Sequence, residues 1–135
     1  MTREDLIELA VEAMSHAYVP YSHFSVGAAL LTKNGHLYPG CNIENAAYGP
    51  TNCAERTAFF KAVYEGEREF SEIAIVGGLN GEIRGFAAPC GICRQVMREF
   101  CDEDFLIHLW DGAEYRTYRL GELLPLGFTA SDMQA

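Results

Sequence analysis

Three cysteines and one glutamate have the side chains needed to bind a metal ion and to act on a water molecule beside it. Cys53 and Glu55 are separated by one alanine, and Cys90 and Cys93 follow later in a Pro-Cys-Gly-Ile-Cys run. A structural zinc ion is normally closed by four protein ligands, whereas a catalytic zinc has three and keeps its fourth position for water. A nearby carboxylate can accept a proton from that water and later return it. The pattern predicts a catalytic site with one Zn²⁺ per chain, the ligands Cys53, Cys90 and Cys93, and Glu55 as the catalytic residue.

Other interpretations of the cysteines remain open at this point. A Cys-x-x-Cys pair can be redox-active, although that function needs neither Cys53 nor Glu55. An iron–sulfur cluster would need a fourth cysteine close to the others. A purely structural zinc would make the chain a binding module, and it would also need a fourth ligand. The candidates for that ligand are the remaining cysteines, otherwise expected to be buried thiols, and the histidines: Cys41, Cys101, His16, His23, His36 and His108.

Both metal motifs are expected at the beginning of a helix. Cys53 opens a stretch with an apolar stripe, and Thr51 and Asn52 before it are polar residues of the kind that cap helices. Pro89 precedes a second stretch, 90–100, with apolar side chains at three- and four-residue intervals. A helix N-terminus carries partial positive charge, which favours a thiolate over a thiol. Both positions therefore help to ionise the predicted ligands.

The remaining segments predict an α/β fold. Thr2 and Asp5 form a capping-box pattern, Asn34-Gly35 is typical of a tight turn, and Pro39 marks either an irregularity or an edge strand. The order α-β-β-α-β-α-β-β indicates a mixed sheet with helices packed on its faces. Helices are expected over 3–16, 53–65 and 90–100, a helical turn over 122–124, and strands over 25–32, 36–43, 73–76 (ended by Gly77-Gly78), 105–110 and 115–120.

Composition limits the class of protein. With 135 residues and 49% hydrophobic content, we expect one domain, residues 1–135, with a real core. Ten Lys and Arg against nineteen Asp and Glu give a net charge of −9, so a nucleic-acid partner is not expected. The first residues lack a signal-peptide pattern, and no apolar run approaches the roughly 18 residues of a membrane span. An odd number of cysteines fits a reducing compartment, so we expect a cytosolic protein without a membrane partner.

Five segments, in the same order, resemble the zinc-dependent cytidine deaminases that act on free nucleosides. Zinc deaminases carry a glutamate that does not bind the metal, a P-C-x-x-C pair, and either His or Cys as the first ligand. Cys53 stands at that first position here, as in the three-cysteine variant. The resemblance implies a three-layer α-β-α fold around a central mixed five-stranded sheet. The segments are Pro20-Tyr21-Ser22-His23-Phe24, Val26-Gly27-Ala28-Ala29-Leu30, Gly40-Cys41-Asn42-Ile43-Glu44-Asn45-Ala46, Cys53-Ala54-Glu55-Arg56-Thr57-Ala58 and Pro89-Cys90-Gly91-Ile92-Cys93-Arg94-Gln95.

This resemblance implies hydrolytic deamination of cytidine and 2′-deoxycytidine to uridine and 2′-deoxyuridine, with release of ammonia, as in pyrimidine salvage. Glu55 would take a proton from the attacking water, pass it to N3 of the pyrimidine, and later protonate the departing amino group. The enzymatic alternative is a related zinc deaminase that acts on another aminated base or on a nucleoside antibiotic such as blasticidin S.

The resemblance also implies the residues around the substrate. Asn42 and Glu44 would bind the ribose hydroxyls, with Asn45 in the same segment, Phe24 would stack on the pyrimidine ring, and the backbone around Ala54 would bind its polar edge. Arg56 would donate hydrogen bonds to ligand sulfurs, which matters because three thiolates and Zn²⁺ sum to a charge of −1. Small members of the family are homotetramers with shared active sites. Ala46, Tyr48 and Phe128 match positions that contribute across the subunit interface.

Overall fold

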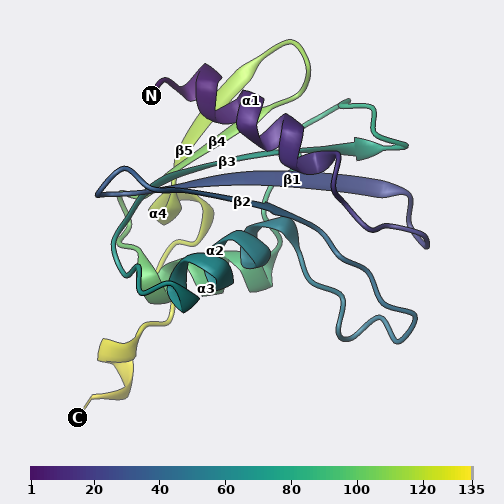
Figure 1. The fold of residues 1–135 in the computed structure, drawn as a ribbon. Coiled ribbons are helices and arrows are strands. Elements are labelled where there is room, and N and C mark those ends of the chain that lie inside the picture. The colour runs from purple at the N-terminus through teal and green to yellow at the C-terminus, as the bar shows by residue number, and fades with distance from the viewer. Residues whose placement is uncertain (135) are drawn as a thin grey trace.

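A computed structural model describes residues 1–134 and shows a five-stranded sheet between two layers of helices (Figure 1). The strands are β1 (Phe24–Thr32), β2 (Leu37–Cys41), β3 (Phe70–Leu79), β4 (Leu106–Trp110) and β5 (Tyr115–Arg119). The helices are α1 (Arg3–Met14), α2 (Ala54–Tyr64), α3 (Gly91–Phe100) and the short α4 (Leu120–Leu123), followed by a 3₁₀ turn, η1 (Ala130–Met133).

The sheet is mixed, as expected. Its strand order is β2-β1-β3-β4-β5, with β3 and β4 parallel and the other neighbouring pairs antiparallel. Figure 1 shows α1 on one face, and α2 and α3 side by side on the other. The predicted three-layer α-β-α architecture is therefore confirmed.

Two neighbouring interior strands, β1 and β3, supply side chains to a core on each face of the sheet. Successive side chains of a strand point to opposite faces, so Leu30 and Ile75 pack toward α2 and α3, whereas Ala29 and Val76 pack toward α1. Phe59 of α2 is fully buried. Its ring lies 5.0 to 6.3 Å, between centroids, from the rings of Phe70, Phe100 and Phe105. This aromatic cluster fixes α2 and α3, which carry the cysteine motifs, to the same face of the sheet.

Two glycines allow helices to approach the sheet closely. A Cβ atom on Gly27 in β1 would lie 2.0 Å from the backbone oxygen of Ala10 in α1. A Cβ atom on Gly40 in β2 would lie 2.4 Å from the backbone oxygen of Ala54, the first residue of α2. Gly40 thus determines how near the beginning of α2, and hence the first metal motif, can come to the sheet.

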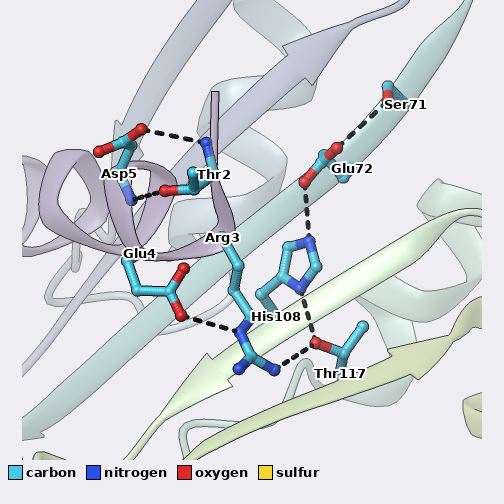
Figure 2. A network of polar contacts seen from close by, with 8 residues as sticks. All are labelled: Thr2, Arg3, Glu4, Asp5, Ser71, Glu72, His108 and Thr117. Atoms are coloured by element: carbon cyan, nitrogen blue, oxygen red, sulfur yellow. Dashed lines mark hydrogen bonds and ion pairs between the residues drawn. The ribbon is translucent and has the colours of Figure 1, made fainter.

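A polar network joins the N-terminus of α1 to three strands (Figure 2). His108 of β4 is 5% exposed, and its ring nitrogens lie 2.8 Å from Glu72 Oε1 of β3 and 2.8 Å from Thr117 Oγ1 of β5. Arg3 Nη1 donates to the same Thr117 oxygen at 3.1 Å. The network satisfies a buried imidazole on the α1 face of the sheet. It lies opposite the helices that carry the cysteines, so His108 takes no part in their site.

The observed ends of several elements differ from the predicted ones. The capping box of Thr2 and Asp5 is present, but α1 ends at Met14 rather than at residue 16. The prediction that Gly77-Gly78 ends the third strand was wrong, because β3 runs from Phe70 to Leu79 and both glycines pair with β1. Of the two alternatives for Pro39, the structure shows the edge strand, because β2 is the outermost strand of the sheet. Among the helices of residues 1–134, none has the length and apolar character needed to span a bilayer.

Candidate active site

The two metal motifs meet at the N-terminal ends of α2 and α3. Cys53 is the N-cap residue of α2 and Cys90 that of α3, both with extended backbone and with no hydrogen bond from the side chain to the helix. Thr51 and Asn52 were expected to cap α2, which is wrong by one or two positions. Because neither sulfur is used as a cap, both remain free to face a metal beside two positively polarised helix ends.

The three sulfurs have the spacing that a zinc ion requires. The Sγ atoms of Cys53, Cys90 and Cys93 all lie within 4.8 Å of one another, and those of Cys53 and Cys90 are 3.7 Å apart. In a tetrahedral site with Zn–S bonds of about 2.3 Å, two sulfurs lie about 3.8 Å apart. All three cysteines are free thiols. The donor set therefore fits zinc.

The site offers three protein ligands and no fourth. Within residues 1–134, no further cysteine, histidine or carboxylate joins this group. Cys101 is buried as expected, whereas Cys41 is only half-buried. A structural zinc closed by four residues and a cysteine-bound iron–sulfur cluster therefore both lack a ligand here. An open fourth position is the property of a catalytic zinc.

Arg56 lies against the sulfur cluster. Its Nη2 donates to Cys53 Sγ at 3.2 Å, while its Nε is buried without a partner among the described residues. In the metal-free protein the pKa of Cys53 is lowered because Cys93 donates a hydrogen bond to it and Arg56 donates another. The hydrogen bond that Cys93 donates to Cys53 raises the pKa of Cys93, so Cys93 is the thiol that keeps its proton. The guanidinium thus stabilises negative charge on the sulfurs.

Glu55 occupies the second position of α2 and is 4% exposed. Burial raises the pKa of Glu55 to about 7, and negative charge on Cys53 acts in the same direction. A carboxyl group with a pKa near neutrality can accept a proton and release it again at the same pH. Glu55 lines the same cavity as Cys53 and Cys90, so its carboxyl group is held beside the metal position.

A cavity of about 400 Å³ opens over this group. Its volume is typical of a pocket for a small ligand. Phe24, Asn42 and Ala54, three of the predicted substrate-binding residues, line it together with Glu55. Sequence reasoning missed the rest of the wall: Val26, Phe86, Ala87 and Ala88. The last three precede Pro89 directly, so their position before the second motif was the available signal.

Asn42 and Glu44 follow β2, which ends at Cys41 rather than at residue 43 as predicted. Asn42 accepts a hydrogen bond from Val26 N at 2.9 Å and donates one to Phe24 O at 2.8 Å. Glu44 accepts from the backbone of Tyr21 and Ser22, and from the Ser22 hydroxyl. The hydrogen bonds that Ser22 donates, chiefly the one from its hydroxyl, lower the pKa of Glu44. The Glu44 carboxyl group is therefore held as an anion.

Glu44 and the remaining predicted residues lie outside the lining of this cavity. Tyr48 lines a neighbouring depression of about 320 Å³ with Glu44, and it is 73% exposed. Asn45 is engaged locally, with its backbone N–H bonded to Thr51 and its side chain to Ala47 N. Ala46 is exposed, and Phe128 is 58% exposed after α4. Within one chain, the fold does not bring Ala46, Tyr48 or Phe128 into the lining of the cavity that contains Glu55.

These observations define a class: a zinc-dependent hydrolase with three cysteine sulfurs spaced for the metal and a buried carboxyl group in the same cavity. Residues 1–109 match the family model described as the cytidine and deoxycytidylate deaminase zinc-binding region. The chain is 50% identical over 134 residues to a cytidine deaminase of Halalkalibacterium halodurans, covering 98% of each chain.

Solved structures agree with this match. The crystal structure of a cytidine deaminase from Burkholderia pseudomallei has a TM-score of 0.88 and 49% identity, over 95% of this chain and 100% of that one.

A more distant relative, a blasticidin-S deaminase of Bacillus cereus, is 32% identical over 130 residues, 93% of this chain and 91% of that protein. The chain belongs to the cytidine deaminase family of zinc-dependent hydrolases.

Proposed function

We propose that this chain hydrolyses the C4–N bond of cytidine and 2′-deoxycytidine, giving uridine or 2′-deoxyuridine and ammonia. The observation that carries the proposal is the buried carboxyl of Glu55 beside three sulfurs spaced for zinc, at one wall of a nucleoside-sized cavity. The ligands would be Cys53, Cys90 and Cys93. When bound, zinc would supply a Lewis acid that makes a water molecule acidic enough to lose a proton near neutral pH.

Glu55 would carry each proton that the reaction moves. It accepts one from the attacking water and passes it to N3 of the pyrimidine, which makes C4 electrophilic. After the water oxygen has bonded to C4, Glu55 takes its second proton and delivers it to the amino group. The C4–N bond breaks, ammonia leaves and the carbonyl of uridine forms. A pKa of about 7 suits both halves of this cycle.

Arg56 would offset the charge of the site. Three thiolates with one divalent ion leave a net charge of −1, and negative charge at the metal weakens its effect on water. The hydrogen bond from Arg56 Nη2 to Cys53 Sγ withdraws part of that charge. This role depends on contact with the sulfur and not on contact with the substrate.

The cavity suits a neutral nucleoside. Phe24 is 41% exposed and lines the cavity, so its ring is available to stack on a pyrimidine, and the backbone at Ala54 would bind the polar edge of the base. The Glu44 carboxylate and the Asn42 amide oxygen each keep a free lone pair that could accept a ribose hydroxyl, with Asn45 in the same segment.

We further propose that a homotetramer completes the site. Ala46, Tyr48 and Phe128 are exposed in the single chain and would contribute to the pocket of a neighbouring subunit. Light scattering at micromolar concentration is expected to give a mass near four chains. A fully active monomer would exclude these residues from the shared site. We also propose a cytosolic location and a role in pyrimidine salvage. Turnover of free nucleosides would support the salvage role.

Substrate comparison tests the proposed reaction directly. Ultraviolet absorbance would be followed for cytidine, deoxycytidine, adenosine, guanine and blasticidin S under identical conditions, with ammonia release as a second readout. The proposal requires that the two cytosine nucleosides be used far better than the others. Preferential loss of blasticidin S would instead support the antibiotic deaminase alternative, which has a relative at 32% identity.

A further inference from the structure

Cys90 is the least enclosed of the three sulfur ligands. Cys93 is 1% exposed, and Cys53 is half-buried and bonded to Arg56. Cys90 is exposed and makes no capping hydrogen bond through its side chain. Packing therefore holds Cys90 less firmly than it holds Cys93, and the backbone on either side has to fix its orientation.

Arg94 holds both peptide groups that flank Cys90. Its side-chain Nε donates to the carbonyl of Pro89 at 2.7 Å, and its backbone N–H donates to the carbonyl of Cys90 at 3.0 Å. The first carbonyl belongs to the peptide group before Cys90 and the second to the one after it. Two fixed peptide planes determine the backbone dihedrals between them, here φ −68° and ψ 169°. The Pro89 side chain is fully buried, which anchors the same segment from the other side.

The same guanidinium reaches the C-terminal part of the chain. Arg94 Nη1 donates to the carbonyl of Leu123 at 2.7 Å, at the end of α4. The next residue, Gln95, donates from Nε2 to the carbonyl of Phe128 at 2.9 Å. None of the ion pairs within residues 1–134 includes Arg94, so its partners in the described chain are carbonyl groups. Its role is geometric, because a planar fork can bridge two acceptors.

We propose that Arg94 is the positioning residue for the zinc ligand Cys90 and couples metal retention to the C-terminal segment, residues 120–128. Removing the fork frees the Pro89 carbonyl and lets Cys90 rotate, so zinc leaves faster. Conversely, bound zinc restrains Cys90 and, through Arg94, the end of α4. The inference rests on the zinc site of the proposed function but not on the identity of the substrate.

Zinc release from the holoenzyme tests the first part. The purified zinc-loaded proteins would be mixed with a chelator whose absorbance changes when it binds zinc. The rate of zinc transfer would be measured for Arg94→Gln and for Arg98→Gln. Arg98 is a matched control, since it lies one turn later in α3 and donates to a backbone carbonyl, that of Cys101, at 2.8 Å. We expect release at least about tenfold faster for Arg94→Gln, the size of effect found for groups that orient metal ligands. Equal rates for the two variants would overturn the proposal.

A conservative variant and hydrogen exchange test the coupling. Arg94→Lys keeps the charge but presents a single point donor, so zinc release is expected to stay fast, and a wild-type rate would contradict the geometric role. In the wild-type protein, zinc removal is expected to speed exchange of the Leu124 amide, which is bonded to Leu120 O at 2.8 Å. In Arg94→Lys this zinc-dependent difference is expected to shrink. An unchanged difference would contradict the proposed coupling between zinc and the C-terminal segment. Neither zinc release nor hydrogen exchange requires turnover of cytidine.

Discussion

Replacing Glu55 by glutamine is expected to stabilise the metal-free protein at alkaline pH. The carboxyl is 4% exposed, and its burial raises its pKa from 4.5 to about 7. A group whose pKa is higher in the folded than in the unfolded chain binds its proton more tightly in the fold. While Glu55 is protonated in both the folded and the unfolded chain, its ionisation does not change the free energy of unfolding. As the pH rises from 4.5 through 7, ionisation of Glu55 lowers the free energy of unfolding.

The size of this effect follows from the shift. The difference between 7 and 4.5 is 2.5 pKa units, and each unit corresponds to about 1.4 kcal/mol, so the cost approaches about 3 kcal/mol at pH 8. Glutamine has nearly the same shape and no charge. The free energy of unfolding of metal-free Glu55→Gln is therefore expected to exceed that of the wild type by about 3 kcal/mol at pH 8, and by almost nothing at pH 4.5.

Urea unfolding of chelator-treated protein would measure this difference, with fluorescence of Trp110, the single tryptophan, as the signal. Glu8→Gln is the control, because Glu8 is exposed on α1 and its replacement is expected to change stability by less than about 0.5 kcal/mol. Equal stability of Glu55→Gln and the wild type at pH 8 would refute the reasoning. So would a difference that persists at pH 4.5.

Three other changes have defined outcomes. Gly40→Ala places a Cβ atom 2.4 Å from Ala54 O, so urea unfolding is expected to show a loss of roughly 1–3 kcal/mol, whereas Gly91→Ala, with no atom within 4 Å, would be tolerated. Arg56→Ala removes the donor to Cys53 Sγ and is expected to lower turnover and zinc affinity about 10–100-fold, more than it lowers stability; unchanged zinc content, pH profile and turnover would make Arg56 only a structural residue. CMP and dCMP are expected to have specificity constants at least about tenfold below those of the nucleosides, because the Glu44 carboxylate and a net charge of −9 repel phosphate. Equal use of CMP at fixed ionic strength would reveal a phosphate site.

Much of the positioning of the metal motifs was predictable because it depends on local signals. The apolar spacing of 90–100 and the run that begins at Cys53 both indicated helices, and the structure begins α2 and α3 one residue after Cys53 and Cys90. The conclusion that these cysteines converge rested on their residue types. Three thiols near a carboxylate favoured a zinc site with an open position over the redox pair and the structural zinc, and the family resemblance supported that choice.

The third strand was predicted, but its end was placed wrongly because glycine is ambiguous in sequence. Gly77 and Gly78 were interpreted as a strand end, but both continue the ladder with β1. A Cβ atom on Gly78 would lie 1.7 Å from the backbone oxygen of Glu82, so the loop that returns under the strand requires glycine there. This is a contact between segments that no periodic pattern reports.

The wall of the cavity formed by Phe86 was also beyond sequence reasoning. Residues 80–89 form neither helix nor strand, so they carry no periodicity, and their path depends on the tertiary structure. Phe86 is half-buried, with the Arg116 guanidinium carbon 4.1 Å from its ring centroid. That contact joins a loop to β5, far away in sequence, and only the folded chain brings the two together.

The central claim is that Glu55 transfers the protons of a zinc-dependent deamination. The most direct test measures zinc content and cytidine turnover together in the wild type and in Glu55→Gln. We predict one zinc ion per chain in both proteins, and turnover at least ~10²–10⁴-fold lower in the variant, as expected when a general acid–base is lost. A zinc-replete Glu55→Gln protein with near-normal turnover would contradict the account.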